Sequence, residues 1–174
     1  MFVRMMRDKG YDFYRQDKYC ENLFAKEFDL ENIVAQKQFE VVTAFEVFEH
    51  LPDPVRGIEE MLTFGKSILF STELSPDKNI SSWWYLVPEA GQHVSMYHYS
   101  TLAYLAKRFN LNFYSNYSTI HILTPKKINP WLFRLFCRYK FSLVYSSLRS
   151  KPSLLQRDFE KSMASLKETY LPKS

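Results

Sequence analysis

Three residues that can act as ligands or as acid–base groups follow one apolar stretch of the chain. Glu46, Glu49 and His50 come directly after residues 41–45, which read Val-Val-Thr-Ala-Phe. Their i, i+3, i+4 spacing places all three on one side of a helical turn, if the chain enters such a turn after the apolar stretch. Two carboxylates and an imidazole suit a divalent cation, because oxygen ligands favour Mg²⁺ and the imidazole also admits a transition metal. Such a cation would lower the pKa of an acceptor hydroxyl and make its oxygen a better nucleophile.

Two further roles are open for the same residues. His50, or the later His93, can act as a general base, since the ordinary pKa of histidine suits proton transfer near neutral pH. Alternatively, Glu46 caps a turn or touches a cofactor, Glu49 faces solvent and His50 packs under a loop. The residue types and their spacing do not choose between a cation site, a general base and an ordinary structural role.

The elements that position these residues alternate between helix and strand. Asp53 and Pro54 indicate a helix start, and Ser100 is the expected cap of a later helix. We predict helices at residues 2–9, 21–28, 54–64 and 100–109. We predict strands at residues 11–16, 39–45, 66–72, 111–117 and 119–123. The last two strands are close enough for an antiparallel hairpin. The pattern predicts an α/β fold with a mostly parallel sheet and helices on both faces.

Two stretches do not follow this alternation. Residues 73–99 lack a clear period, and loops of such length are often functional. Their rings at Trp83, Trp84 and Tyr85 would suit a flat or lipid-like acceptor, or would simply plug the core. Residues 130–147 predict an aromatic and basic helix, and residues 158–169 a polar one. The apolar face expected within residues 131–145 consists of Leu132, Leu135, Phe136, Tyr139 and Leu143. It can lie on an anionic membrane surface, or dock on its own domain or a partner subunit.

The bulk composition excludes several classes of protein. The 174 residues are 46% hydrophobic and 24% charged, which is typical of one globular domain. A net charge of +4 is too small to indicate nucleic-acid binding without a concentrated basic patch. Cys20 and Cys137 match no metal or redox spacing, so reduced thiols in a cytoplasmic protein are expected. We find no signal peptide and no segment apolar enough to span a bilayer.

Two local signatures in this order resemble those of class I S-adenosylmethionine-dependent methyltransferases. The most similar group is typified by the ubiquinone-biosynthesis O-methyltransferases. Its fourth strand ends in Glu-x-x-Glu-His before a helix start with proline, as Glu46, Glu49, His50 and Pro54 do here. A second signature precedes the final hairpin and is matched by His93, Tyr97, Ser100, Leu102, Leu105 and Ala106. The resemblance covers residues 1–124, which leaves residues 125–174 as a C-terminal helical extension.

The resemblance implies a cofactor, an activity and several site residues. It implies a Rossmann-like sheet and methyl transfer from S-adenosylmethionine to a small-molecule or lipid-like acceptor. Expected cofactor contacts are Asp17, which follows the strand at residues 11–16, with Phe45 and Glu46. Some relatives bind a metal at the Glu-x-x-Glu-His motif, and in an RNA-methylating branch a later histidine joins, for which His93 is the candidate.

The family hallmark is a glycine-rich turn after a first strand. Glycine is needed there because the backbone turns tightly against the cofactor. None of the four glycines of this chain fits such a turn. We therefore expect the fold to be N-terminally incomplete. The alternative to an enzyme is a non-catalytic remnant of the fold, or an interaction module.

Overall fold

The computed structural model describes residues 1–17, 19–32 and 38–170. Its contacts divide the chain into two compact units, one of Met1–Gln36 with Leu143–Ser174 and the other of Lys37–Ser142. We call the first the terminal unit and the second the sheet unit. The boundary expected at residue 124 marks the end of the family resemblance, and it stays a prediction.

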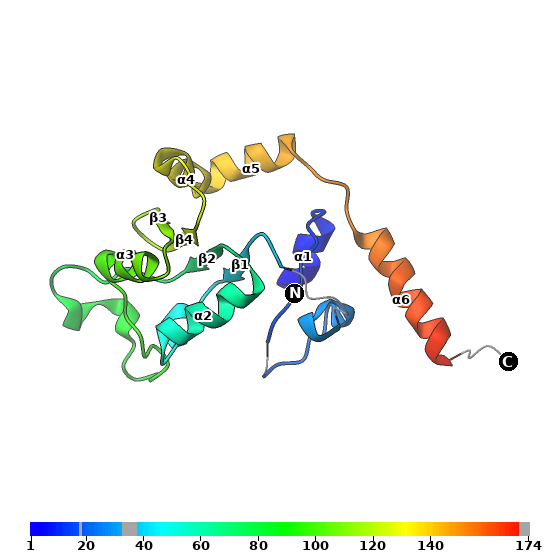
Figure 1. Ribbon diagram of the computed structural model, residues 1–174, viewed down its shortest axis with the longest axis horizontal. Helices are drawn as coiled ribbons and strands as arrows, with labels where there is room; N and C mark the ends of the chain where they lie inside the picture. The colour runs from blue at the N-terminus through cyan, green and yellow to red at the C-terminus, as the bar shows by residue number, and fades with distance from the viewer. Residues whose placement is uncertain (18, 33–37, 171–174) are drawn as a thin grey trace. The chain divides into compact units, whose positions relative to one another are not determined.

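Four strands form a sheet in the sheet unit (Figure 1). They are β1 (Val42–Ala44), β2 (Ile68–Ser71), β3 (Asn112–Ser115) and β4 (Ile120–Thr124). Their order is β1-β2-β4-β3, in which β1 and β2 are parallel and both other pairs are antiparallel. The expected hairpin is confirmed as β3–β4. The expectation of a mostly parallel sheet is wrong for the described residues, because residues 11–16 add no strand to it.

Helices cover both faces of this sheet, as expected (Figure 1). On one face, α2 (Pro54–Phe64) and α3 (Tyr99–Arg108) bury Ile58 and Leu102 against Phe70. Along β3, successive side chains point to opposite faces. Phe113 therefore joins this core, while Tyr114 meets Phe133 of α4 (Pro130–Phe136) on the other face.

The ends of α2 and α3 show which local signals decide a helix start. Asp53 caps α2 by accepting a hydrogen bond from the Arg56 backbone N–H at 3.1 Å, as the sequence predicts. The cap expected at Ser100 is wrong, because α3 already begins at Tyr99. His98 is its N-cap, and the Nδ1 atom of His98 accepts from the Ser100 N–H at 3.3 Å.

The terminal unit contains α1 (Phe2–Asp8) and α6 (Leu155–Tyr170). The helix predicted at residues 2–9 is confirmed, and Gly10 follows it with a left-handed φ of 81°. The helix predicted at residues 21–28 is wrong, since only a short 3-10 helix, Lys26–Phe28, forms. Asn22 explains this: its side-chain oxygen accepts from the Ala25 N–H at 3.0 Å, a local bond that competes with a helix. The strand predicted at residues 11–16 is reduced to one bridge between Arg15 and Asp29.

A buried ion-pair network joins α1 to α6 within the terminal unit. Arg7 is fully buried, and its Nε and Nη2 donate to the two carboxylate oxygens of Asp158 at 2.8 Å. Arg4 donates to the same carboxylate, and Arg7 also donates to Asp12, both at 2.8 Å. Burial alone would raise the pKa of Asp158, but the hydrogen bonds from Arg7 and Arg4 outweigh it and hold that pKa below its usual range.

The aromatic and basic helix predicted at residues 130–147 is divided into α4 and α5 (Tyr139–Leu148). The chain turns at Cys137 and Arg138, where the rings of Phe136 and Phe141 meet edge to face at 5.2 Å. The single apolar face expected across residues 131–145 is therefore interrupted. Within the described ranges, we find no helix with the length and apolar character needed to cross a membrane.

Candidate functional site

The candidate site is built on a short 3-10 helix, Phe48–His50, that follows β1. Phe48 is fully buried and stacks on Phe70 of β2 with ring centroids 3.9 Å apart. The Tyr97 hydroxyl donates to the Phe48 carbonyl at 2.9 Å. Because Phe48 is fixed in the core, the two residues after it have a defined position at the end of the sheet.

The long irregular segment before α3 is attached to this 3-10 helix by main-chain bonds. The carbonyl of Glu49 accepts from the backbone N–H groups of both Val94 and Ser95, at 2.9 and 3.0 Å. These bonds hold His93 beside Glu49. His93 therefore lies next to Glu49 in space, although the two residues are more than forty positions apart in the sequence.

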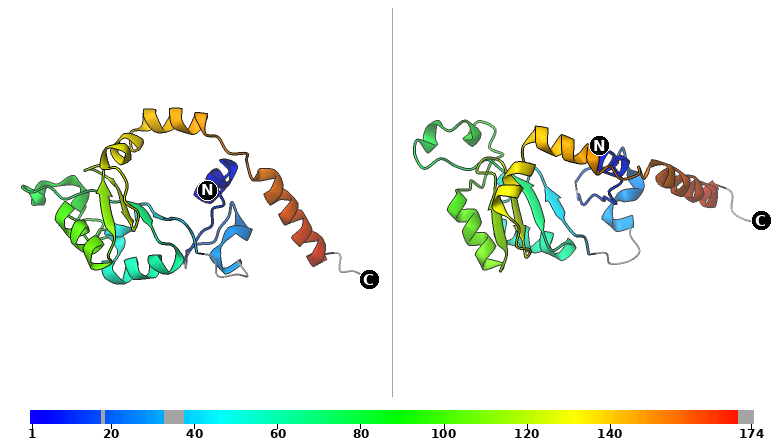
Figure 2. Two further views of the ribbon diagram at one scale, coloured as in Figure 1. Left: turned by 45° about the horizontal axis from the view of Figure 1, so that its top comes forward. Right: turned by 90° about the horizontal axis from the view of Figure 1, so that it is seen from above.

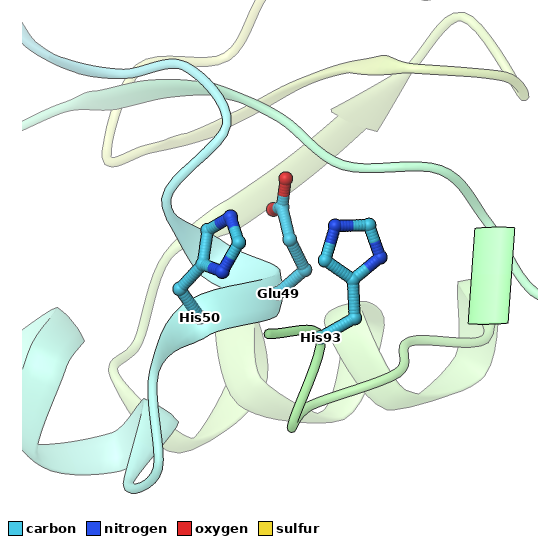
Figure 3. A group of neighbouring side chains, drawn as sticks. All are labelled: Glu49, His50 and His93. Atoms are coloured by element: carbon cyan, nitrogen blue, oxygen red, sulfur yellow. The ribbon is translucent and has the colours of Figure 1, made fainter. Parts of the chain in front are cut away.

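Glu49, His50 and His93 form one cluster, with the two imidazole rings on either side of the carboxylate (Figure 3). One ligand atom from each residue lies within 4.8 Å of the others. The Glu49 side chain is fully buried, and neither carboxylate oxygen has a hydrogen-bond partner among the described residues. A buried carboxylate without partners is costly, so a bound cation or a hydrogen-bond donor would stabilise this one.

Backbone carbonyls fix the tautomer of both histidines. His50 Nδ1 lies 2.8 Å from the Gln92 carbonyl oxygen, and His93 Nδ1 lies 2.6 Å from that of Tyr85. A carbonyl oxygen only accepts, so each Nδ1 carries a hydrogen and donates it. In the neutral ring, the lone pair is then on Nε2. Both Nε2 atoms are therefore able to bind a cation or to accept a proton.

Two buried tyrosines interact electrostatically with the Glu49 carboxylate. Burial, and then the neighbouring Glu49 carboxylate, raise the pKa of Tyr85, although the two groups do not reach hydrogen-bonding geometry. The hydroxyl of Thr72 is also buried without a partner in the described part of the chain. Burial raises the pKa of Tyr97 to about 12, and Glu49 adds to the effect. The sequence indicates Tyr85 only as part of an aromatic loop, and it gives no signal for Thr72.

Glu46 and Phe45 lie apart from the cluster. Glu46 has a left-handed φ of 52°, so the helical turn begins after it rather than at it. Its N–H donates to Ser71 Oγ at 2.8 Å, and the same hydroxyl donates to its carboxylate at 2.6 Å. Among the described residues, the cluster contains His93 in the place expected for Glu46. Both Phe45 and Glu46 are exposed at the carboxyl end of β1.

Asp17 belongs to the terminal unit and is described within it. Its Oδ1 accepts from the N–H groups of Tyr19 and Cys20, at 2.9 and 3.2 Å. The bond from Tyr19 is the main reason why the pKa of Asp17 is lowered. Asp17 therefore stabilises a turn, and its expected contact with the cofactor ribose stays a prediction.

Comparison with known proteins assigns the chain to a protein family. A family described as a methyltransferase domain matches residues 1–116, which is well over half of the sequence. The chain belongs to the methyltransferase domain family. No curated protein and no solved structure matches it. Membership supports a transferase that moves a methyl group, and the family generally uses S-adenosylmethionine as the donor. The finer resemblance to ubiquinone-biosynthesis enzymes stays a prediction.

Proposed function

We propose that this protein transfers a methyl group from S-adenosylmethionine to a small-molecule or lipid-like acceptor, and that the Glu49 cluster activates the acceptor. One observation carries the second part of the proposal. A fully buried carboxylate without hydrogen bonds lies between two histidines whose Nδ1 atoms are held by backbone carbonyls. A purely structural carboxylate would be expected to have donors around it.

The first form of this proposal is a divalent-cation site. Two imidazoles and one carboxylate are a mixed nitrogen and oxygen set, which favours a transition ion such as Mn²⁺ over the Mg²⁺ suggested by the sequence. Hydrogen bonds from the ligating rings to backbone carbonyls are the usual support of such a site. A bound cation would lower the pKa of an acceptor hydroxyl. Glu49, His50 and His93 would hold it, while Glu46 would remain with Ser71.

The second form needs no metal. Nε2 of His93 or His50 would take the proton of the acceptor as a general base, and the Glu49 carboxylate would stabilise the resulting imidazolium. The buried position of Glu49 makes this interaction stronger than in water. Both forms use the same three side chains, and they differ in whether activity depends on a divalent ion.

The exposed end of β1 suits the cofactor. Ligands of α/β proteins bind at the carboxyl ends of parallel strands, and β1 and β2 are the parallel pair here. Phe45 offers a flat ring and Glu46 a carboxylate at that edge, and both are exposed. These residue types fit S-adenosylmethionine, whose sulfonium centre supplies the methyl group.

Titration with Mn²⁺ alone tests the cation site. We expect the full chain to bind Mn²⁺, as followed by electron paramagnetic resonance, and Glu49→Gln and His93→Gln to lose that binding. Glu59→Gln is the matched control, because Glu59 is an exposed carboxylate outside the cluster. Mn²⁺ binding that is unchanged in Glu49→Gln would exclude the cation site and leave the general-base form.

Calorimetric titration with S-adenosylmethionine tests the donor. We expect binding by the folded full chain, with circular dichroism as the check of folding. Absence of binding by a folded chain would remove the catalytic proposal and favour the non-catalytic alternative. Loss of binding in Phe45→Ser and Glu46→Gln would confirm the expected cofactor edge.

A further inference from the structure

Residues 126–151, which we call the basic–aromatic segment, differ from the rest of the chain in charge. They contain seven Lys and Arg residues and no Asp or Glu. The net charge of the whole chain is only +4, so the remaining residues are net acidic. The small overall charge therefore hides a strongly basic region. This region includes α4 and α5, which follow one another along the chain (Figure 2).

One side of α4 packs against β3 and the turn after it, which belong to the same unit as α4. Phe133 packs against Tyr114 of β3, with ring centroids 6.4 Å apart. Arg134 donates to the Tyr117 hydroxyl at 2.8 Å and lies over that ring. These contacts turn other apolar side chains of α4 outward. Trp131 is 76% exposed and Leu132 is 52% exposed.

Four of the exposed apolar side chains of α5 form a stripe, while the exposed Tyr139 and Leu143 lie outside it. Residues at i, i+3, i+4 and i+7 share one face of a helix. At these positions α5 has Phe141, Val144, Tyr145 and Leu148, all of them exposed. Val144 is 59% exposed and Leu148 is 78% exposed. The other side of α5 has Ser142, Ser146 and Ser147, and each hydroxyl donates to a main-chain carbonyl of the helix itself.

Basic side chains flank both apolar faces. Lys127 precedes α4, Arg138 and Lys140 lie where the helices meet, and Arg149 follows α5. All four are exposed, and within the described ranges none forms an ion pair. Long Lys and Arg side chains can keep their charge in water while their stems cover an apolar surface. Apolar stripes bordered by cations are the pattern of helices that lie in a membrane interface.

We propose that α4 and α5, each through its own exposed apolar face, bind the surface of an anionic lipid membrane. In this arrangement Trp131, Leu132, Val144 and Leu148 enter the region of the lipid headgroups, while the flanking Lys and Arg residues contact the anionic groups. Charge complementarity selects this occupant. A second copy of the chain would bring two strongly basic segments together, which like-charge repulsion opposes.

The side chains also distinguish lipid from nucleic acid. Single-stranded nucleic acid binds to basic grooves in which bases stack on flat rings. Leu132, Val144 and Leu148 have no rings, yet they are among the exposed side chains of the two helices. Aliphatic groups gain free energy by leaving water for a lipid interface. The exposed surface therefore fits lipid better than it fits bases.

Co-sedimentation with vesicles tests the proposal with the full chain. We expect the protein to pellet with vesicles of phosphatidylcholine and phosphatidylserine, and far less with phosphatidylcholine alone. Added NaCl should weaken the binding, because salt screens the contribution of the basic side chains. Circular dichroism of every variant verifies that the chain remains folded.

Two variants separate the apolar and the basic contributions. The pair Val144→Ser and Leu148→Ser should weaken vesicle binding at least about tenfold, since two aliphatic side chains no longer leave water. Its control is Tyr104→Ser on α3, a residue that is 64% exposed and lies outside the segment. The triple Arg138→Gln, Lys140→Gln and Arg149→Gln should weaken binding about 100-fold.

A second triple variant, Lys66→Gln, Lys78→Gln and Lys107→Gln, removes the same charge from exposed positions elsewhere in the chain. It should keep most of the binding. Equal losses in the two triple variants would overturn the proposal, and so would equal binding to neutral vesicles or no pelleting at all. Binding of a poly(U) RNA in place of vesicles would assign the segment to nucleic acid. A dimer abolished by Val144→Ser and Leu148→Ser, without vesicle binding, would assign it to self-association.

Discussion

Two carboxylates, one in each compact unit, are removed from solvent in opposite ways. Asp158 of the terminal unit is 4% exposed, and its oxygens accept hydrogen bonds from Arg7 and Arg4. Glu49 of the sheet unit is fully buried, and its oxygens have no such partners in the described part of the chain. Asp158 joins two helices at opposite ends of the sequence. Among the residues that the structure describes, the Glu49 carboxylate joins no two elements.

This difference implies two roles. The Asp158 carboxylate stabilises the fold, whereas the Glu49 carboxylate is held in place by the fold without stabilising it. A buried ion pair with good geometry compensates much of the cost of desolvation, and losing one partner is strongly destabilising. A buried carboxylate without partners lowers stability instead. Such a residue persists at functional sites, where its interaction with a ligand or a proton outweighs that cost. Three predictions test this contrast.

Removing the charge of Asp158 should have the largest effect on stability. Asp158→Asn leaves the buried Arg7 with only the half-exposed Asp12 as a counter-charge, and we expect a loss of about 3 kcal/mol. Hydrogen exchange followed by mass spectrometry should show faster exchange in both α1 and α6. Glu160→Gln, at an exposed position of the same helix, should change stability by less than about 0.5 kcal/mol. Unchanged protection of α1 in Asp158→Asn would show that the ion pair does not join the helices.

Replacing Glu49 should have a smaller effect of the opposite sign. Glu49→Leu exchanges a desolvated carboxylate for an apolar side chain of similar size, and we expect a gain of up to about 2 kcal/mol. Urea denaturation followed by tryptophan fluorescence reports on the sheet unit, because Trp83, Trp84 and Trp131 all belong to it. Glu59→Leu, at an exposed position of α2, is the control. A loss of several kcal/mol in Glu49→Leu would mean that the carboxylate stabilises the fold, and the contrast with Asp158 would disappear.

The smallest expected effect is on pH dependence. The free energy of unfolding should fall at different pH values in the two units, because different buried groups take up protons. His121 is fully buried between Ser115 and the Thr72 carbonyl, and burial lowers its pKa. The unfolded chain therefore takes up a proton first, at pH values near about 6.5. The contribution of His121 is present above that pH and is lost as the pH falls toward the lowered pKa of the folded state.

His121→Gln should flatten this part of the pH profile, as measured by urea denaturation. The contribution of Asp158 should persist to lower pH. Its pKa is also lowered in the fold, so it is lost only as the pH falls below about 3.9 and through that lowered pKa. Loss of protection in α6 already at pH 6 would contradict this order.

Elements with strong local signals were predictable from the sequence. The start of α2 follows from Asp53 and Pro54, and the β3–β4 hairpin follows from two apolar runs with a short gap. The failures occur where side chains bond to the backbone or to distant residues. Asn22 replaces a helical turn with a local hydrogen bond. Without a strand at residues 11–16, the antiparallel pairings outnumber the parallel one.

The candidate site was predictable in part, for a similar reason. Glu49 and His50 are neighbours in sequence, so their proximity needs only one turn of chain. The positive φ of Glu46 separates it from them, and no spacing rule anticipates that conformation. Tyr85 comes near the Glu49 carboxylate only through the path of the long irregular segment that contains it. Such contacts depend on tertiary packing, and a local pattern does not contain them.

The bond between the Glu49 carbonyl and the loop that bears His93 has a consequence for how this site can diverge. Main-chain atoms alone form it, with the N–H groups of Val94 and Ser95 as donors. Every amino acid has the same carbonyl, so a change of side chain at position 49 leaves the loop attached. Descendants of this protein can therefore acquire a new chemistry at that position by a single substitution, while the architecture around it is inherited intact.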